Sequence, residues 1–92
     1  RKLYESEILY AESFLHDLVI HTKTQEYRIK ENISAFAGQL SADFFRVHRS
    51  YLVNLKAVLR ISRSSVTLEG GAEIPLARGK YDEIHRAFIE RN

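Results

Sequence analysis

The stretch FFRVHRSYLVNLKAV, residues 44–58, decides the fold of this sequence. Its apolar residues of one parity are Phe45, Val47, Tyr51 and Val53. An apolar residue at every second position is typical of a strand with one buried face. The polar triplet His48-Arg49-Ser50 interrupts the pattern, and all three side chains can hydrogen-bond a ligand. We therefore expect the triplet to break the strand and the apolar residues on either side to anchor it.

The rest of the chain predicts a mainly β domain. Short strands are expected over residues 8–11, 18–22, 26–30, 57–62, 65–68 and 73–76. The tripeptide 23–25 has the length of a hairpin loop, and Gly70-Gly71 marks a turn. Apolar residues at helical spacing predict two short helices, one over 33–40 with Asn32 as N-cap and one after Gly79. No helix-turn-helix is visible.

Length and composition indicate one globular domain over residues 1–92. Apolar residues make up 45% of the chain and charged residues 28%, which argues against disorder. The absence of cysteine excludes disulfides and thiolate zinc sites and fits a cytoplasmic protein. No apolar run approaches the ~20 residues of a membrane helix, so we expect no membrane contact by this segment. The chain begins with Arg1, so it is expected to be part of a longer protein.

Positive charge is concentrated in the middle of the chain. The net charge is only +2, but residues 44–80 contain seven Lys or Arg against two Glu. Residues 44–68 contain five basic residues and no acid. Such a segment attracts polyanions, although a solvated basic sheet face has the same composition.

No residue pattern indicates an enzyme. The four histidines (His16, His21, His48 and His85) have no metal-ligand spacing. Ser50 has no nucleophile-elbow context, and Gly70-Gly71 is too short to cradle a phosphate. We therefore expect no catalytic activity, no metal and no cofactor.

Two basic segments are candidates for nucleic-acid binding. Arg49 has a planar fork of donors suited to a guanine edge or a phosphate, and His48 and Ser50 suit phosphate oxygens. Arg78 and Lys80 follow a predicted strand at the start of a helix, where backbone N–H groups favour anions. A capped turn with a surface salt bridge explains the triplet equally well on these grounds.

Three blocks of sequence, in order, resemble the LytTR DNA-binding domain family. Residues 44–54 are similar to the family's F-x-R-x-H-R-S-x-x-V-N core. Residues 8–13 resemble its opening strand, and residues 74–78 resemble its I-P-V-S-R segment with Ala77 in place of the serine. The resemblance extends over roughly residues 7–90.

This resemblance implies a LytTR-like fold of small antiparallel sheets, elongated, with one or two short helices. It implies sequence-specific double-stranded DNA binding by loops in the major groove. The implied biological role is transcription regulation, as the output domain of a bacterial two-component response regulator. The implied partners are promoter DNA with direct repeats, a second copy of the chain on that DNA, and a receiver or other sensory domain N-terminal to the segment.

The resemblance also implies DNA-contacting residues. Arg49 and Arg78 are expected to contact bases in successive major-groove segments. His16 is the better candidate in the loop 14–17, because Asp17 would repel phosphate. His48 is expected to point inward and hold its loop by a hydrogen bond, with a direct DNA contact as the other role. The residues expected to set register through phosphates are Arg46, Ser50, Arg63 and Lys80.

A protein-interaction or dimerisation module with weak, non-specific DNA binding is the alternative function. Its surface would be formed by the amphipathic ends of the chain, with Tyr4, Ile8, Ile84 and Phe88. The residues expected to form the scaffold are Tyr10, Phe45, Val47, Val53, Ile61, Leu68, Ile74, Ile84 and Phe88.

Overall fold

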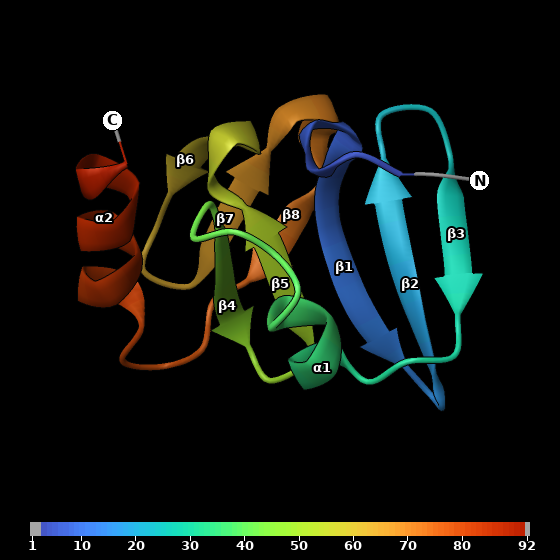
Figure 1. The fold of residues 1–92 in the computed structure, drawn as a ribbon. Helices are drawn as coiled ribbons and strands as arrows, with labels where there is room; N and C mark the ends of the chain where they lie inside the picture. Colours follow the sequence, from blue (N-terminus) through green and yellow to red (C-terminus); the bar gives the residue numbers. More distant parts are fainter. Residues whose placement is uncertain (1–2, 92) are drawn as a thin grey trace.

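The computed structural model describes residues 3–91, which form two antiparallel sheets and two α-helices (Figure 1). The strands are β1 (Ile8–Phe14), β2 (Asp17–Thr22), β3 (Glu26–Ile29), β4 (Phe44–His48), β5 (Tyr51–Asn54), β6 (Val58–Ile61), β7 (Ser65–Leu68) and β8 (Glu73–Pro75). The helices are α1 (Ile33–Ala37) and α2 (Tyr81–Glu90), with short 3₁₀ segments at Glu5–Glu7, Leu55–Ala57 and Glu69–Gly71. The molecule measures 34 × 24 × 24 Å, so the predicted mainly β, elongated fold is confirmed.

The larger sheet has the strand order β3-β2-β1-β5-β4. The β4–β5 hairpin takes up residues 44–54 of the quoted stretch. The break falls at Arg49-Ser50, within the predicted triplet, while His48 still pairs with Tyr51 and belongs to β4. It joins the N-terminal hairpin through β1, where Tyr10 lies opposite Val53. The sheet therefore combines strands that lie about 40 residues apart in sequence.

The smaller core lies between this sheet and α1. Its buried residues are Ile8, Ala11, Leu18, Ile20, Ile33, Phe36 and Leu52. The side chain of Asn32 accepts a hydrogen bond from the Ala35 backbone N–H at 2.7 Å, which confirms the predicted N-cap. The helix is shorter than the predicted 33–40, because tighter i to i+3 hydrogen bonds follow Ala37. Leu40 nevertheless packs against this core.

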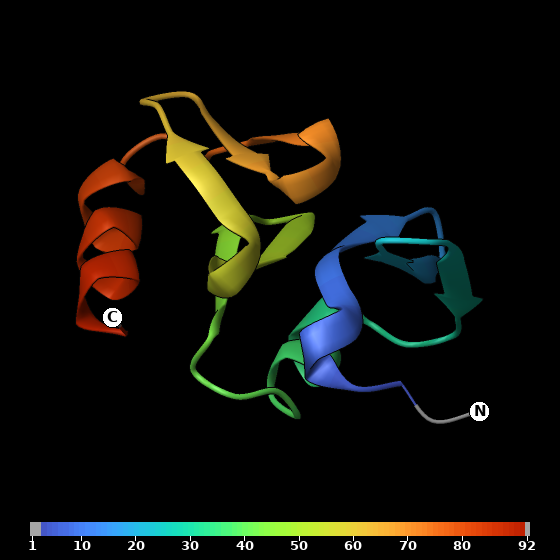
Figure 2. The same cartoon turned by 90° about the horizontal axis from the view of Figure 1, so that it is seen from above.

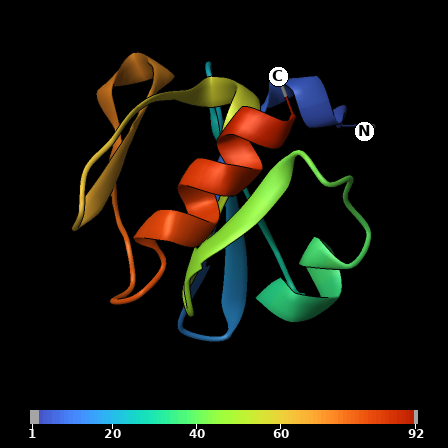
Figure 3. The same cartoon turned by 90° about the vertical axis from the view of Figure 1, so that its left-hand side faces the viewer.

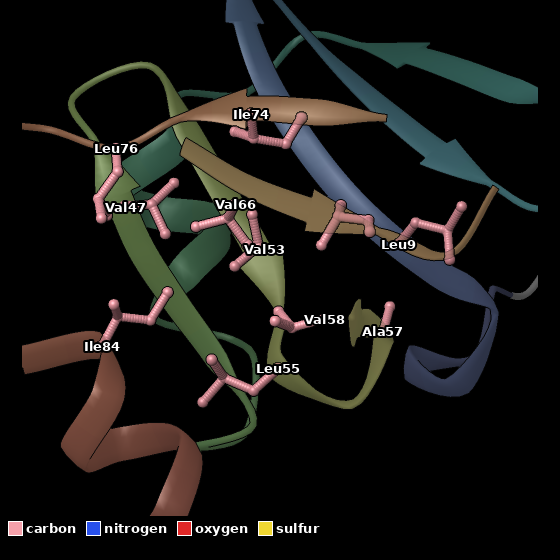
Figure 4. Close-up of a cluster of buried hydrophobic side chains, with 11 residues drawn as sticks. Leu9, Val47, Val53, Leu55, Ala57, Val58, Val66, Ile74, Leu76 and Ile84 are labelled. Atoms are coloured by element: carbon pink, nitrogen blue, oxygen red, sulfur yellow. The ribbon is translucent and has the colours of Figure 1, made fainter. Parts of the chain in front are cut away.

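The larger core fills the space between β4 and β5, the three-stranded sheet β6-β7-β8 and α2 (Figures 2 and 4). Its fully buried residues include Val47, Val53, Leu68 and Ile84. The remaining predicted scaffold residues also belong to it or pack against it: Tyr10, Phe45, Ile61, Ile74 and Phe88. These contacts join the two sheets and α2 through one shared core.

Some strands end at other residues than the sequence predicts, because backbone pairing, and not the side-chain pattern, sets where a strand ends. β1 continues to Phe14 because Glu12 and Ser13 pair with β2, although their side chains are polar. Pro75 ends β8 at the edge of its sheet, as expected for a residue without a backbone N–H. Within residues 3–91, no helix combines the length and apolar character needed to cross a membrane.

The C-terminal end of α2 is tied to the loop before β4. Arg91 Nε donates to Asp43 Oδ1 at 2.9 Å, and Lys56 Nζ lies 3.6 Å from Asp43 Oδ2. The hydrogen bond from Arg91 holds the pKa of the Asp43 carboxyl below its ordinary value of 3.8, with a further contribution from Lys56. A lowered pKa in the folded state means that the ionised form stabilises the fold.

Asp43→Asn is expected to lower the melting temperature at pH 7. The stabilisation by the carboxylate is fully present above pH 3.8 and is lost as pH falls through the lower folded-state pKa. Thermal unfolding followed by circular dichroism between pH 7 and pH 2 measures this difference. Glu90→Gln, which removes an exposed carboxylate from the last turn of α2, is the control. A wild-type minus variant difference that persists unchanged at pH 2 would contradict the electrostatic explanation.

Candidate functional site

The β4–β5 turn presents Arg49 to solvent. Ser50 N–H donates to His48 Nδ1 at 3.0 Å, and the His48 ring packs edge-on against Tyr51 with 5.5 Å between the ring centroids. His48 thus holds the turn by a hydrogen bond, the inward arrangement favoured from the sequence. Its nitrogen must be unprotonated to accept this bond, which leaves Nε2 to carry the proton in the neutral ring.

Arg46 braces the same turn from its other side. Its Nε donates to the His48 carbonyl oxygen at 3.1 Å, and Nη2 donates to the Arg49 carbonyl oxygen at 2.6 Å. Nη1 donates to Ser34 Oγ on α1 at 3.2 Å. Two carbonyl oxygens of the turn and one helix are therefore joined by a single guanidinium. No sequence signal indicates Ser34, which lies 12 residues before Arg46.

The Arg49 side chain is exposed and makes no hydrogen bond or ion pair with any other residue of the described range 3–91. Its backbone is fixed by Arg46, while its guanidinium keeps all its donors for a ligand. A fixed backbone lowers the entropy that the side chain loses on binding. This combination is what a specific polar contact requires.

Two hydrogen bonds between distant segments place two further loops beside this turn. Ser13 N–H donates to the Ser50 carbonyl oxygen at 2.9 Å, which brings the β1–β2 turn alongside. Ala77 N–H donates to the Val47 carbonyl oxygen at 2.8 Å, which brings the segment between β8 and α2 to the end of β4. Figures 1 and 3 both show the three loops at the lower edge of the molecule.

The segment between β8 and α2 contributes Arg78 and Lys80. Arg78 is exposed and has no polar side-chain contact with another residue between 3 and 91. Lys80 is half-buried at the start of α2, with its Nζ 3.4 Å from Glu83. Arg63, in the β6–β7 turn, stacks its guanidinium over the Tyr81 ring at 4.4 Å from the centroid. Three segments therefore supply two exposed arginines without a side-chain partner among residues 3–91, Arg49 and Arg78, and two partly engaged cations.

His16 is exposed in the β1–β2 turn, next to Asp17 at the start of β2. Lys30 Nζ lies 2.7 Å from one Asp17 oxygen, and Arg28 Nη1 lies 3.0 Å from the other. These two cations, Lys30 most strongly, lower the pKa of Asp17. The structure thus compensates the negative charge of Asp17, which was the reason to prefer His16 as the contact in this loop.

Acid–base groups lie together on the larger sheet, in strands β1, β2 and β5. His21 Nε2 is 2.7 Å from Glu12 Oε1, and the His21 ring stacks on Tyr10 with 4.2 Å between centroids. Burial, with help from Glu12, raises the pKa values of Tyr10 and Tyr51. In the part of the chain that the structure describes, no three His, Cys, Asp or Glu side chains are placed to hold a metal ion.

The surface required by the interaction-module alternative is not formed as the sequence suggested. Ile8 and Ile84 are 3% and 0% exposed and belong to the two cores. Their apolar spacing reflects packing within the domain. Of the four residues expected there, only Tyr4 is largely exposed, and Phe88 is half-buried against the larger core.

Comparisons with known proteins agree on one family. A family model described as the LytTr DNA-binding domain matches residues 2–89. A solved structure of the LytTr DNA-binding domain from a protein described as a methyl-accepting/DNA response regulator of Bacillus cereus superposes with a TM-score of 0.77. The two chains are 21% identical, and the match covers 91% of this chain and 82% of that one. No curated protein matches the chain.

Proposed function

The chain belongs to the LytTr DNA-binding domain family, and from this premise we propose that its three-loop edge binds double-stranded DNA with sequence preference. The β1–β2 turn, the β4–β5 turn and the segment before α2 form that edge. The observation that carries the proposal is the exposed Arg49 side chain on a backbone braced by Arg46. A fork of unused donors at a fixed position suits a base edge in the major groove.

The distances between the loops limit how the edge lies on DNA. The bond between Ala77 and Val47 keeps the Cα atoms of Arg49 and Arg78 within about 17 Å, from three chain steps and one hydrogen-bonded pair. One turn of B-DNA is about 34 Å long. Arg49 and Arg78 are therefore proposed to contact bases within a single turn, in adjacent groove segments. His16 lies on the other side of the Arg49 turn from Arg78. It is proposed to extend the contact along the DNA in the direction away from Arg78.

Other cations at the edge fix the register on the duplex through phosphates. Lys80 lies at the start of α2, two residues after Arg78, Arg63 stacks on Tyr81 next to Lys80, and His48 and Ser50 flank Arg49 in the β4–β5 turn. Phosphate contacts position a protein, and base contacts specify sequence. The biological role proposed is transcription regulation as a response-regulator output domain, with two copies on direct repeats in a promoter and a receiver domain on the same polypeptide.

Selection of bound sequences from a random pool of duplexes tests this function. A repeated short motif is the expected result, with fluorescence anisotropy titrations giving tighter binding to the motif than to random DNA. Anisotropy that shows equal, weak binding to every duplex would favour the interaction-module alternative.

Arg46→Lys is expected to weaken binding to the selected motif by roughly 1–2 kcal/mol, because lysine keeps the charge but loses the fork that holds two carbonyl oxygens. Binding to random DNA and the salt dependence should stay unchanged. Ser34→Ala, which removes only the contact to α1, should have a smaller effect. Equal losses on both duplexes would instead make Arg46 a phosphate contact.

A further inference from the structure

The tip of the β1–β2 turn exposes two adjacent apolar side chains. Leu15 is 81% exposed and Phe14 is 48% exposed. Leu15 is the most exposed large hydrophobic residue within the described range 3–91. Single apolar residues on a surface are ordinary, but two in succession at the end of a hairpin expose a continuous apolar tip.

The backbone at this tip is an unfavourable one for leucine. Leu15 has a φ of +57°, and it is the single non-glycine residue with positive φ among residues 3–91. Asparagine or glycine adopts this conformation more easily, and hairpin turns prefer them. A leucine in this conformation lowers the stability of the domain and belongs to neither core. A contact outside the domain would explain why leucine is found at this position.

The tip is held in one place. The Arg28 guanidinium lies 5.4 Å from the centroid of the Phe14 ring, and its Nη1 donates to Asp17 Oδ2 at 3.0 Å. The bond from Ser13 N–H to the Ser50 carbonyl oxygen joins the base of the tip to the Arg49 turn. The apolar tip and Arg49 therefore belong to the same edge of the molecule.

On the floor of the major groove, the thymine C5-methyl is the apolar group that distinguishes one base pair from another. We propose that Leu15, supported by Phe14, packs against the C5-methyl group of a thymine near the base contacted by Arg49. The inference rests on the proposed DNA-binding function and adds a specificity for thymine. No charged group on the tip itself competes for this contact, since Asp17 is paired with Arg28 and Lys30.

Deoxyuridine substitution tests this contact, because uracil differs from thymine only by the missing methyl group. Each thymine of the selected motif is replaced in turn, and affinity is measured by anisotropy for the wild-type chain and for Leu15→Asn. At one or two positions, uracil should weaken wild-type binding about fourfold, the effect of one buried methyl group. Leu15→Asn should bind the thymine duplex less tightly and be indifferent to uracil at those positions.

Leu59→Asn is the matched control, because Leu59 is 66% exposed on β6 of the other sheet. It should retain the wild-type response to uracil. Asparagine tolerates positive φ, so Leu15→Asn should keep the wild-type circular dichroism spectrum. A motif without a uracil-sensitive position, or a Leu15→Asn variant that stays as sensitive as wild type, overturns the contact and leaves the DNA-binding proposal intact. Failure to enrich any motif overturns both.

Discussion

Val47→Asp is expected to abolish folding of the domain. Val47 is 0% exposed in the larger core, where β4 meets the smaller sheet and α2. An aspartate there would place an unpaired charge among apolar side chains, at a cost of roughly 5 kcal/mol or more when lost packing is included. Globular proteins are stable by about 5–15 kcal/mol, and a domain of this size belongs to the lower part of that range. The substitution therefore removes most or all of the stability.

Urea unfolding followed by circular dichroism, with wild type in parallel, measures this loss. Leu59→Asp introduces the same charge at a position that is 66% exposed and should leave the midpoint nearly unchanged. Val47→Ala, which removes only two methyl groups, should give an intermediate and measurable loss. A folded Val47→Asp variant with a wild-type midpoint would show that the core does not close around this strand.

Arg49→Ala is expected to weaken binding to the selected motif by about 1–3 kcal/mol, or roughly 5- to 150-fold. The reason is that the guanidinium has no hydrogen-bonding partner among residues 3–91 and stands on a braced turn, so its donors are available to one base. Alanine should also relax the base preference at a single position of the motif. The turn itself should survive, because the bonds from Arg46 and Ser50 involve backbone atoms of the turn and the His48 ring.

Repeating the selection and the anisotropy titrations with the variant measures both effects. Arg86→Ala removes the same exposed charge from α2 and should change binding little. Lys80→Ala is the contrasting variant: it should weaken all duplexes alike and lower the slope of log affinity against log salt by about 1. Equal loss on selected and random DNA for Arg49→Ala would defeat its role as a base contact.

Much of the fold was predictable because its signals are local. The tripeptide 23–25 and the Asn32 cap each depend on a few neighbouring residues, and the structure confirms both. The alternating residues 45, 47, 51 and 53 do share one core, but β5 is buried on both faces, because Leu52 belongs to the other core. Strand ends were less predictable. β1 runs to Phe14 because its backbone pairs with β2, which side-chain polarity does not reveal.

The candidate site was predictable only as a set of residue types. Sequence indicated that Arg49 would stand on an anchored turn and that His48 would hold it. The sequence did not indicate that Arg46 donates three hydrogen bonds, two to that turn and one to Ser34. Nor did it indicate that Asp17 is paired with two cations. The partners of Asp17 depend on strand order, because Arg28 lies on β3 and contacts Asp17 only when β3 pairs with β2.

By itself, the sequence determined the order of strands and helices, a break within the triplet 48–50 and the concentration of positive charge in its middle. Only the tertiary structure decided which loops meet. The bonds that join Ser13 to Ser50 and Ala77 to Val47 each connect segments 30 or more residues apart. Backbone N–H and C=O groups are the same in every residue except proline, so the sequence does not select such partners. The shared core that aligns β1, β4 and the segment before α2 selects them.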